Sequence, residues 1–206
     1  MMNDTHSPIH SNVRAYPRKH LLGNAPVEVE LLKPTDGAQV AAFIQKLPTH
    51  DLLFARRDLS HPKVVTAWLE AIAAGSITSL AARSNGELIG CTAIVTDAHS
   101  WSRHVAELRV MTSPHWRGRG LGRLLIQECF ALALGLGLEK LIVHMTVDQR
   151  SAIAVFEELG FRAEAVLHDH VKDRDGTAYD LAILSHDIAG VQARFEVYGV
   201  ADALGN

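Results

Sequence analysis

The sequence predicts a single α/β (α+β) domain with a mixed central sheet of about six to seven strands and flanking helices. Strands and helices alternate between residues 105 and 160, which implies a βαβ crossover and one parallel strand pair. The remaining apolar segments pair around turn dipeptides, which predicts antiparallel hairpins rather than a uniform doubly wound sheet. The chain has 206 residues, of which 48% are hydrophobic and 21% charged, so it can bury a sizeable core.

The first half of the chain combines short strands with two helices. Residues 27–32 alternate like a strand, and residues 34–47 carry an apolar stripe with helical spacing behind a Thr-Asp cap. Residues 61–75 predict a second helix, with a proline near its start and a glycine at its end. Residues 77–95 are two apolar runs around an Asn-Gly dipeptide, which is the strongest short signal for a hairpin.

The second half contains the crossover unit and a final hairpin. Residues 105–114 predict a strand that ends at a proline, and residues 120–136 predict the helix that follows it. Residues 140–147 predict a buried strand, and residues 149–160 predict a helix that a glycine ends. Residues 166–188 predict a hairpin that turns at an Asp-Gly dipeptide.

The composition limits the setting and the partners of the domain. Residues 1–24 contain no apolar signal core and predict a flexible tail, residues 25–190 form the domain, and residues 191–206 form a C-terminal extension. The net charge of −3 provides no global basic field, so neither nucleic acid nor a membrane is an expected partner. No apolar run reaches the ~20 residues of a membrane span. The two cysteines both lie in apolar runs, which favours a reducing, cytoplasmic setting.

A local basic cluster lies at the start of the helix predicted over residues 120–136. Three arginines alternate there with three glycines: Arg117, Gly118, Arg119, Gly120, Gly122 and Arg123. Positive charge is unfavourable at a helix N-terminus, whereas free backbone amides bind anions there and glycine permits close backbone approach. A bound phosphate would reverse the unfavourable charge. The dinucleotide pattern G-x-G-x-x-G fails because residue 123 is arginine, and the P-loop pattern is absent.

The spacing Arg117-x-x-Gly120-x-Gly122 resembles the pyrophosphate loop of the GNAT N-acetyltransferase superfamily, R/Q-x-x-G-x-G/A, which holds coenzyme A. "AELRVMTSPHWRGRGLG" is similar to that family's fourth strand and loop, and "VHMTVDQRSAIAVFEELGFR" is similar to its fifth strand and following helix. The resemblance covers roughly residues 77–165. It implies a GNAT-like domain in which the parallel strand pair splays apart.

The resemblance also implies a reaction and a co-substrate. The reaction is transfer of an acetyl group from acetyl-CoA to a primary amine, by direct attack in a ternary complex. The amine is a protein lysine or N-terminus, an amino acid or another small amine. Carried over to this sequence, the residues that bind acetyl-CoA are Val110, Met111, Thr112, Arg117, Gly118, Arg119, Gly120, Leu121, Gly122, Arg123, Gln149 and Phe156.

Two residues flank the position that the resemblance gives the thioester. Glu107 stands where a number of family members carry a catalytic glutamate, and a surface or salt-bridged glutamate is its alternative interpretation. His144 lies on the fifth strand, near the offset at which N-terminal acetylating relatives carry a catalytic residue, and a hydrogen-bonded core histidine is its alternative. A lysine-type amine has a pKa of about 10.4, so a general base is useful, and Glu107 is the first candidate.

Three alternatives remain open at this point. Phe156 replaces the family tyrosine that often protonates the leaving thiolate, so a non-catalytic acyl-CoA binding or sensing protein of the same fold is the alternative function. A basic nucleic-acid patch is the other interpretation of residues 117–123. His168 and His170 lie on one strand face beside acidic residues, but a polar solvent face is favoured there and no metal is predicted. The resemblance is also compatible with a homodimer.

Overall fold

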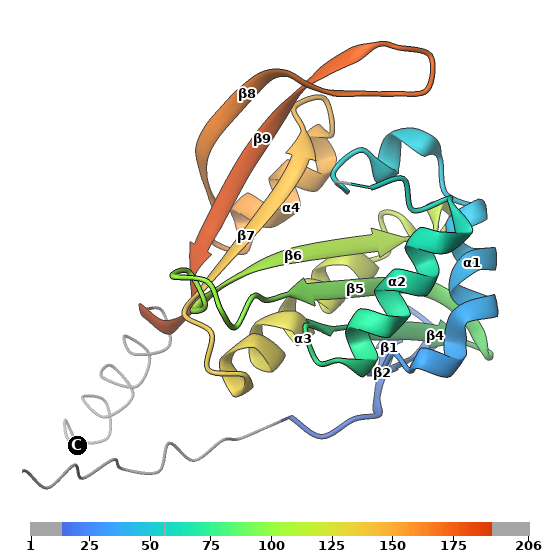
Figure 1. Cartoon of the computed structure of the whole chain (residues 1–206). Helices are drawn as coiled ribbons and strands as arrows, with labels where there is room; N and C mark the ends of the chain where they lie inside the picture. The colour runs from blue at the N-terminus through green and yellow to red at the C-terminus, as the bar shows by residue number, and fades with distance from the viewer. Residues whose placement is uncertain (1–13, 56, 191–206) are drawn as a thin grey trace, which may run out of the picture.

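The strands of the protein form one mixed sheet in the order β1-β2-β4-β5-β6-β7-β9-β8, with β3 paired to β5 (Figure 1). The computed structural model describes residues 14–55 and 57–190. The strands are β1 (Arg18–Leu22), β2 (Ala25–Leu31), β3 (Ile77–Thr78), β4 (Leu80–Ser84), β5 (Glu87–Val95), β6 (Val105–Thr112), β7 (Lys140–Thr146), β8 (Arg162–Lys172) and β9 (Ala178–Asp187). The helices are α1 (Gly37–Gln45), α2 (Pro62–Ala73), α3 (Leu121–Gly135) and α4 (Arg150–Glu158).

The predicted fold class is confirmed, and the sheet is larger than predicted. The described residues form nine strands instead of the expected six to seven. One of the added strands, β1, lies inside the segment 1–24 that was predicted to be a tail, so that boundary is wrong. It pairs antiparallel with β2, with His20 opposite Val27. Residues 1–13 of the predicted tail and the predicted extension 191–206 lie outside the described residues.

The Asn-Gly dipeptide forms the predicted hairpin between β4 and β5. Asn85 and Gly86 both have positive φ, at 50° and 79°, as a type I′ turn requires. The final hairpin is also present, but β8 begins at Arg162 rather than at residue 166. The first residues of β8 are exposed and show no apolar alternation, so the sequence pattern did not identify them as part of the strand.

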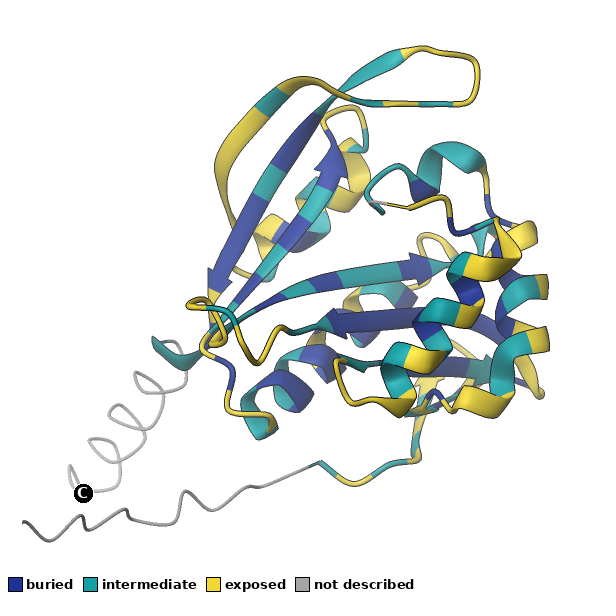
Figure 2. Ribbon diagram, viewed as in Figure 1, coloured by how far each residue is buried: buried dark blue, intermediate teal, exposed yellow. Residues whose placement is uncertain are grey.

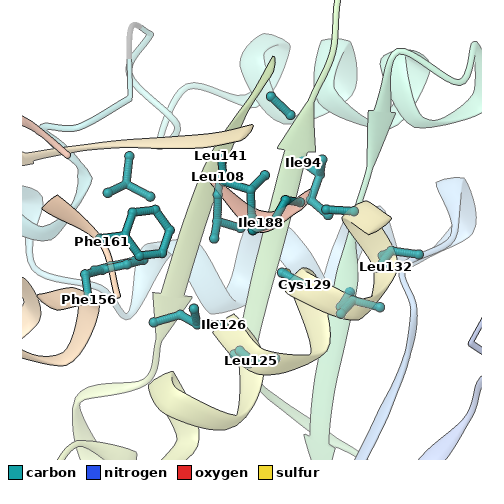
Figure 3. Packing of buried hydrophobic residues seen from close by; sticks show 14 of the residues in the cluster. Ile94, Leu108, Leu125, Ile126, Cys129, Leu132, Leu141, Phe156, Phe161 and Ile188 are labelled. Carbon is teal, nitrogen blue, oxygen red and sulfur yellow. The ribbon is translucent and has the colours of Figure 1, made fainter. Parts of the chain in front are cut away.

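The sheet has helices on both faces, and each layer has its own buried cluster (Figure 2). Helices α1 and α2 cover one face, through residues such as Phe43, Ile44 and Trp68. Helix α3 covers the other face together with α4 (Figure 1). Figure 3 shows this second cluster, where Leu125 and Cys129 of α3 meet strand residues such as Leu108 and Leu141.

The parallel strands β6 and β7 separate soon after they meet. They pair only through Val105 with Lys140, Ala106 with Leu141, and Glu107 with Ile142. Beyond Glu107, β6 stays paired with β5 up to Thr112, while β7 pairs with β9 over its whole length. Figure 1 shows the two strands diverging from this point. The predicted splay is therefore present, and one edge of β6 has no partner strand along residues 108–112 among the described residues.

Candidate active site

The glycine-arginine turn connects the open end of β6 to helix α3. Two glycines in the turn have positive φ, Gly118 at 69° and Gly120 at 86°, which side chains with a Cβ rarely adopt. Gly120 is the residue before the helix, and its carbonyl accepts the first helical hydrogen bond from Leu124 at 3.0 Å. A Cβ added at Gly118 or Gly122 would meet no atom within 4 Å. The turn therefore presents open backbone at a helix N-terminus, which suits an anionic ligand.

Partners from elsewhere in the fold stabilise the arginines of this turn. Arg117 forms an ion pair with Asp51, and Arg123 forms one with Glu158 of α4. The guanidinium of Arg119 lies 5.6 Å from the ring centroid of Trp116, within cation–π range. Leu121, also predicted to be near the ligand, has its side chain fully buried in the core. In this structure, intramolecular partners thus compensate the positive charge that is unfavourable at a helix start.

Glu107, the last residue of β6 that pairs with β7, lies beside His144 of β7. Its Oε1 accepts a hydrogen bond from Arg109 Nε at 2.7 Å, and His144 Nδ1 lies 3.7 Å from the same oxygen. The side chains of Glu107 and His144 are only 10% and 11% exposed. Burial raises the pKa of Glu107, but the interactions with His144 and Arg109 outweigh it and lower the pKa to about 2. Glu107 is therefore a stable carboxylate near neutral pH.

The side chains of this group point to one face of the sheet. Ala106 and Leu108 lie in the cluster under α3, so Glu107 and Arg109 point to the opposite face, the one that α1 and α2 cover. On β7, Val143 and Met145 belong to the α3 cluster, which places His144 on the same face as Glu107. The structure thus brings together the two residues that the sequence analysis proposed as catalytic.

The free edge of β6 presents two backbone amides toward the splay. The amide of Ser113 donates to the carbonyl of Ile89 on β5 at 2.8 Å. Because backbone groups alternate in direction along a strand, Met111 also points its amide toward β5, whereas Val110 and Thr112 point theirs to the opposite edge. The Met111 side chain is buried in the cluster under α1 and α2. Of the three residues predicted to bind the pantetheine arm, Val110 and Thr112 have suitable geometry.

The other two predicted ligand residues differ in their positions. Gln149 directly precedes α4, and its side-chain amide donates to the carbonyl of His50 at 3.3 Å. Phe156 is buried, with 7% exposure, and packs edge-to-face on Phe161 with 4.9 Å between ring centroids (Figure 3). Phe156 is thus part of the core under the sheet, and it offers no proton to a ligand.

A short segment connects the two sides of the splay. It is the 3₁₀ turn Thr49–Leu52, called the strap below. His50 Nε2 lies 2.9 Å from Asp148 Oδ2 just after β7, and Asp51 pairs with Arg117 beyond the end of β6. These contacts join residues 66 to 98 positions apart, so no local sequence pattern reports them.

A cleft of about 730 Å³ lies between the strap region and the β8–β9 hairpin. His144 lines it, together with Leu181 and Ile183 of β9 and residues of β8. A smaller pocket of about 240 Å³ lies between α2 and the strands, and Arg109 and Met111 line it. Arg57 lines both spaces. The cleft therefore gives a second ligand access to the same imidazole that faces Glu107.

Neither a metal centre nor a spanning helix is found in the described part of the chain. Within residues 14–55 and 57–190, no group of three or more His, Cys, Asp or Glu side chains is arranged to hold a metal ion. His168 instead pairs with Asp180 on β9, with 3.2 Å between Nδ1 and Oδ2. Over the same residues, no helix is long and apolar enough to cross a membrane.

Comparison with known proteins agrees with this geometry. The sequence model described as "Acetyltransferase (GNAT) family" matches residues 43–161, which is 119 of the 206 residues. The chain belongs to the GNAT family of acetyltransferases. This confirms the family that the loop and the β7–α4 motif predicted.

Two curated relatives match part of this GNAT-family chain. YwnH of Bacillus subtilis (strain 168), whose name proposes phosphinothricin acetyltransferase activity, is 32% identical over 84 residues, which are 41% of this chain and 51% of YwnH. The IAA acetyltransferase of Azospirillum brasilense is 32% identical over 93 residues, which are 45% of this chain and 60% of that protein. The chain thus spans only about half the length of the curated relatives that it matches.

Solved structures share the fold over most of their length. The GNAT-family acetyltransferase of Streptococcus pneumoniae superposes with a TM-score of 0.68 at 21% identity, covering 78% of this chain and 99% of that one. YncA of Salmonella typhimurium, solved with its cofactor acetyl-CoA, superposes with a TM-score of 0.67 at 20% identity, covering 79% and 94%. The same fold thus holds acetyl-CoA in a structural neighbour.

Proposed function

We propose that the protein transfers the acetyl group of acetyl-CoA to a primary amine, by direct attack in a ternary complex. The observation that carries this proposal is the splay. Its open edge on β6 runs from the phosphate-type turn at Gly120 to the Glu107–His144 pair, and His144 of that pair also lines the cleft. A thioester that lies along this edge meets an amine that enters through the cleft.

The turn before α3 would hold the pyrophosphate of CoA. The first amides of α3 have no partner within the helix, the space over Gly118 and Gly122 is open, and the helix N-terminus favours negative charge there. On binding, the ion pairs of Arg117 with Asp51 and of Arg123 with Glu158 would break, and both arginines would pair with phosphate oxygens instead. The turn supplies both directional donors and charge to one ligand.

The edge of β6 would position the thioester for attack. The amides of Val110 and Thr112 can pair with the pantetheine arm as a neighbouring strand would. A preorganised amide at this edge also stabilises the negative oxygen of the tetrahedral intermediate. Gln149 at the start of α4 lies across the splay and offers an amide to the same arm.

His144 is the better candidate for the base that removes the amine proton. An imidazole accepts a proton near neutral pH, whereas a carboxylate whose pKa is about 2, as in Glu107, is a weak proton acceptor. We therefore reverse the roles expected from the sequence. Glu107 orients the imidazole and stabilises its protonated form, and Arg109 holds the carboxylate in place.

The leaving thiolate receives no proton from Phe156, which stands where the resemblance expects a tyrosine. Thiols have an ordinary pKa of about 8.5, so a thiolate is a tolerable leaving group near neutral pH and can take its proton from water. Turnover is therefore compatible with a buried phenylalanine at this position.

The test is acetyl transfer by the purified protein. Acetyl-CoA is supplied with a panel of amino acids, polyamines, small amines and lysine peptides, while thiol release is followed by colorimetry and acetylated products by mass spectrometry. We expect a thiol and an acetylated amine in equal amounts. Tight CoA binding without any acetylated product across the panel would instead support the acyl-CoA sensing alternative.

A further inference from the structure

We infer that the amine acceptor also carries a carboxylate or a similar oxyanion, and that Arg57 and Lys172 bind that group in the cleft. This inference rests on the acetyl transfer proposed above and narrows its acceptor. It concerns the wall of the cleft of about 730 Å³ that His144 also lines.

The negative charges of this wall already have partners within the protein. Asp58 pairs with Arg174 at 3.0 Å and accepts a hydrogen bond from the Ser60 hydroxyl at 2.6 Å. Asp173 accepts hydrogen bonds from the Tyr179 hydroxyl at 3.0 Å and from the amide of Thr177 at 2.9 Å. These bonds hold the pKa values of both carboxyl groups below their ordinary range, so both stay charged and satisfied. The charge of Asp58 is thus compensated by Arg174, and the oxygens of Asp173 are occupied by neutral donors.

Two positive charges of the wall have no such partner. Among the described residues, neither Arg57 nor Lys172 forms an ion pair, although both line the cleft. They approach it from two elements, the segment after the strap and the end of β8. With Arg174, the wall has three cationic side chains and two anionic ones. It therefore has an excess of positive charge.

The position of Arg57 links this charge to the reaction. Arg57 lines both the cleft and the smaller pocket that Arg109 and Met111 line, so it lies where the two spaces adjoin. A guanidinium binds a carboxylate through two parallel hydrogen bonds, which fixes the orientation of the ligand as well as its position. An acceptor anchored in this way through its anionic group can direct its amine toward His144. The same excess of positive charge disfavours polyamines.

The test compares amino acids with their carboxamides, which have the same shape but lack the charge. We expect kcat/KM, calculated per unprotonated amine, to favour the acid by about tenfold to a hundredfold, as charge-assisted hydrogen bonds provide. Arg57→Gln should reduce this ratio to near one, and Arg57→Lys should retain part of it. Arg103→Gln removes an exposed arginine outside both pockets and should leave the ratio unchanged.

The outcomes separate this inference from the proposed function. Transfer to carboxamides or polyamines as efficient as transfer to amino acids would refute the anionic acceptor while leaving acetyl transfer intact. An acid preference that persists in both Arg57→Gln and Lys172→Gln would also refute it, because the anion would then bind elsewhere. The failure of every amine in the panel, with CoA bound, would instead refute the transfer itself.

Discussion

Replacement of Glu107 by glutamine tests the division of labour between Glu107 and His144. In the proposed mechanism, His144 takes the amine proton and Glu107 positions the imidazole and stabilises the positive charge that develops on it. Glu107→Gln keeps the shape of the side chain but removes its negative charge. The maximal kcat should fall by roughly tenfold, because the imidazole is then less well oriented and its developing charge is no longer compensated.

The size of the effect follows from the distances. A carboxylate oxygen 3.7 Å from an imidazole nitrogen attracts a positive charge on the ring by about 4 kcal/mol at an effective dielectric constant of about 20. Arg109, at 2.7 Å from the same oxygen, offsets part of this attraction. A remaining effect of about 1.4 kcal/mol in the transition state corresponds to about tenfold in kcat. Arg109→Gln is the matched variant, and it should lower kcat less than Glu107→Gln, because it leaves the carboxylate beside the imidazole.

The assay is colorimetric thiol release from acetyl-CoA between about pH 5.5 and 10, with the best amine from the panel. His144→Gln should lower kcat by ~100- to ~10,000-fold, with CoA affinity retained in calorimetry. The reasoning is refuted if Glu107→Gln lowers kcat by this much and His144→Gln does not. Glu107 would then be the base despite its low pKa.

Two further changes test other parts of the site, and unfolding in acid tests the pairing of Glu107. Gly120→Val places a branched side chain in the turn, where φ is 86°. The CoA Kd should rise at least about tenfold in a variant that circular dichroism shows to be folded. An unchanged Kd would exclude this turn as the CoA site. Asp51→Asn frees Arg117 for phosphate and should lower the CoA Kd about two- to fivefold, an effect that high salt removes; weaker binding would mean that Asp51 supports the site. Folding lowers the pKa of Glu107 from 4.5 to about 2. At about 1.4 kcal/mol per pH unit, its pairing contributes about 3 kcal/mol to the free energy of unfolding above pH 4.5. This contribution is lost as the pH falls to 2. Denaturant unfolding of Glu107→Gln should show a flatter acid dependence over this interval, and an identical slope would contradict the pairing.

Local signals predicted most of the fold. The Asn85-Gly86 turn, the glycine-bounded helices and the apolar strands all depend on neighbours within a few residues, and the structure contains each of them. Strand β1 was missed because its sequence "RKHLL" is short and half polar, and its pairing with β2 supplies the order that its composition does not predict.

The site was predictable in part, for a related reason. The turn around Gly120 has its own sequence pattern, and the family resemblance placed Glu107 and His144 on neighbouring strands. Their roles were not predictable, because the pKa of Glu107 depends on Arg109 and on a residue of another strand. The contacts of the strap and the charge of the cleft were missed because they join residues that are distant in sequence.

The short parallel ladder between β6 and β7 joins the two halves of the sheet. One half carries the turn at Gly120, and the other carries His144, yet only three residue pairs join them directly along this seam. An acetyl-CoA arm bound along β6 would act as an inserted strand that closes the seam from within. Hydrogen exchange at the amides of Val110 and Thr112 should therefore be fast in the free protein and slow with CoA bound, while the β4–β5 hairpin exchanges equally in both. A co-substrate bound in this way would take the place of a strand between β6 and β7.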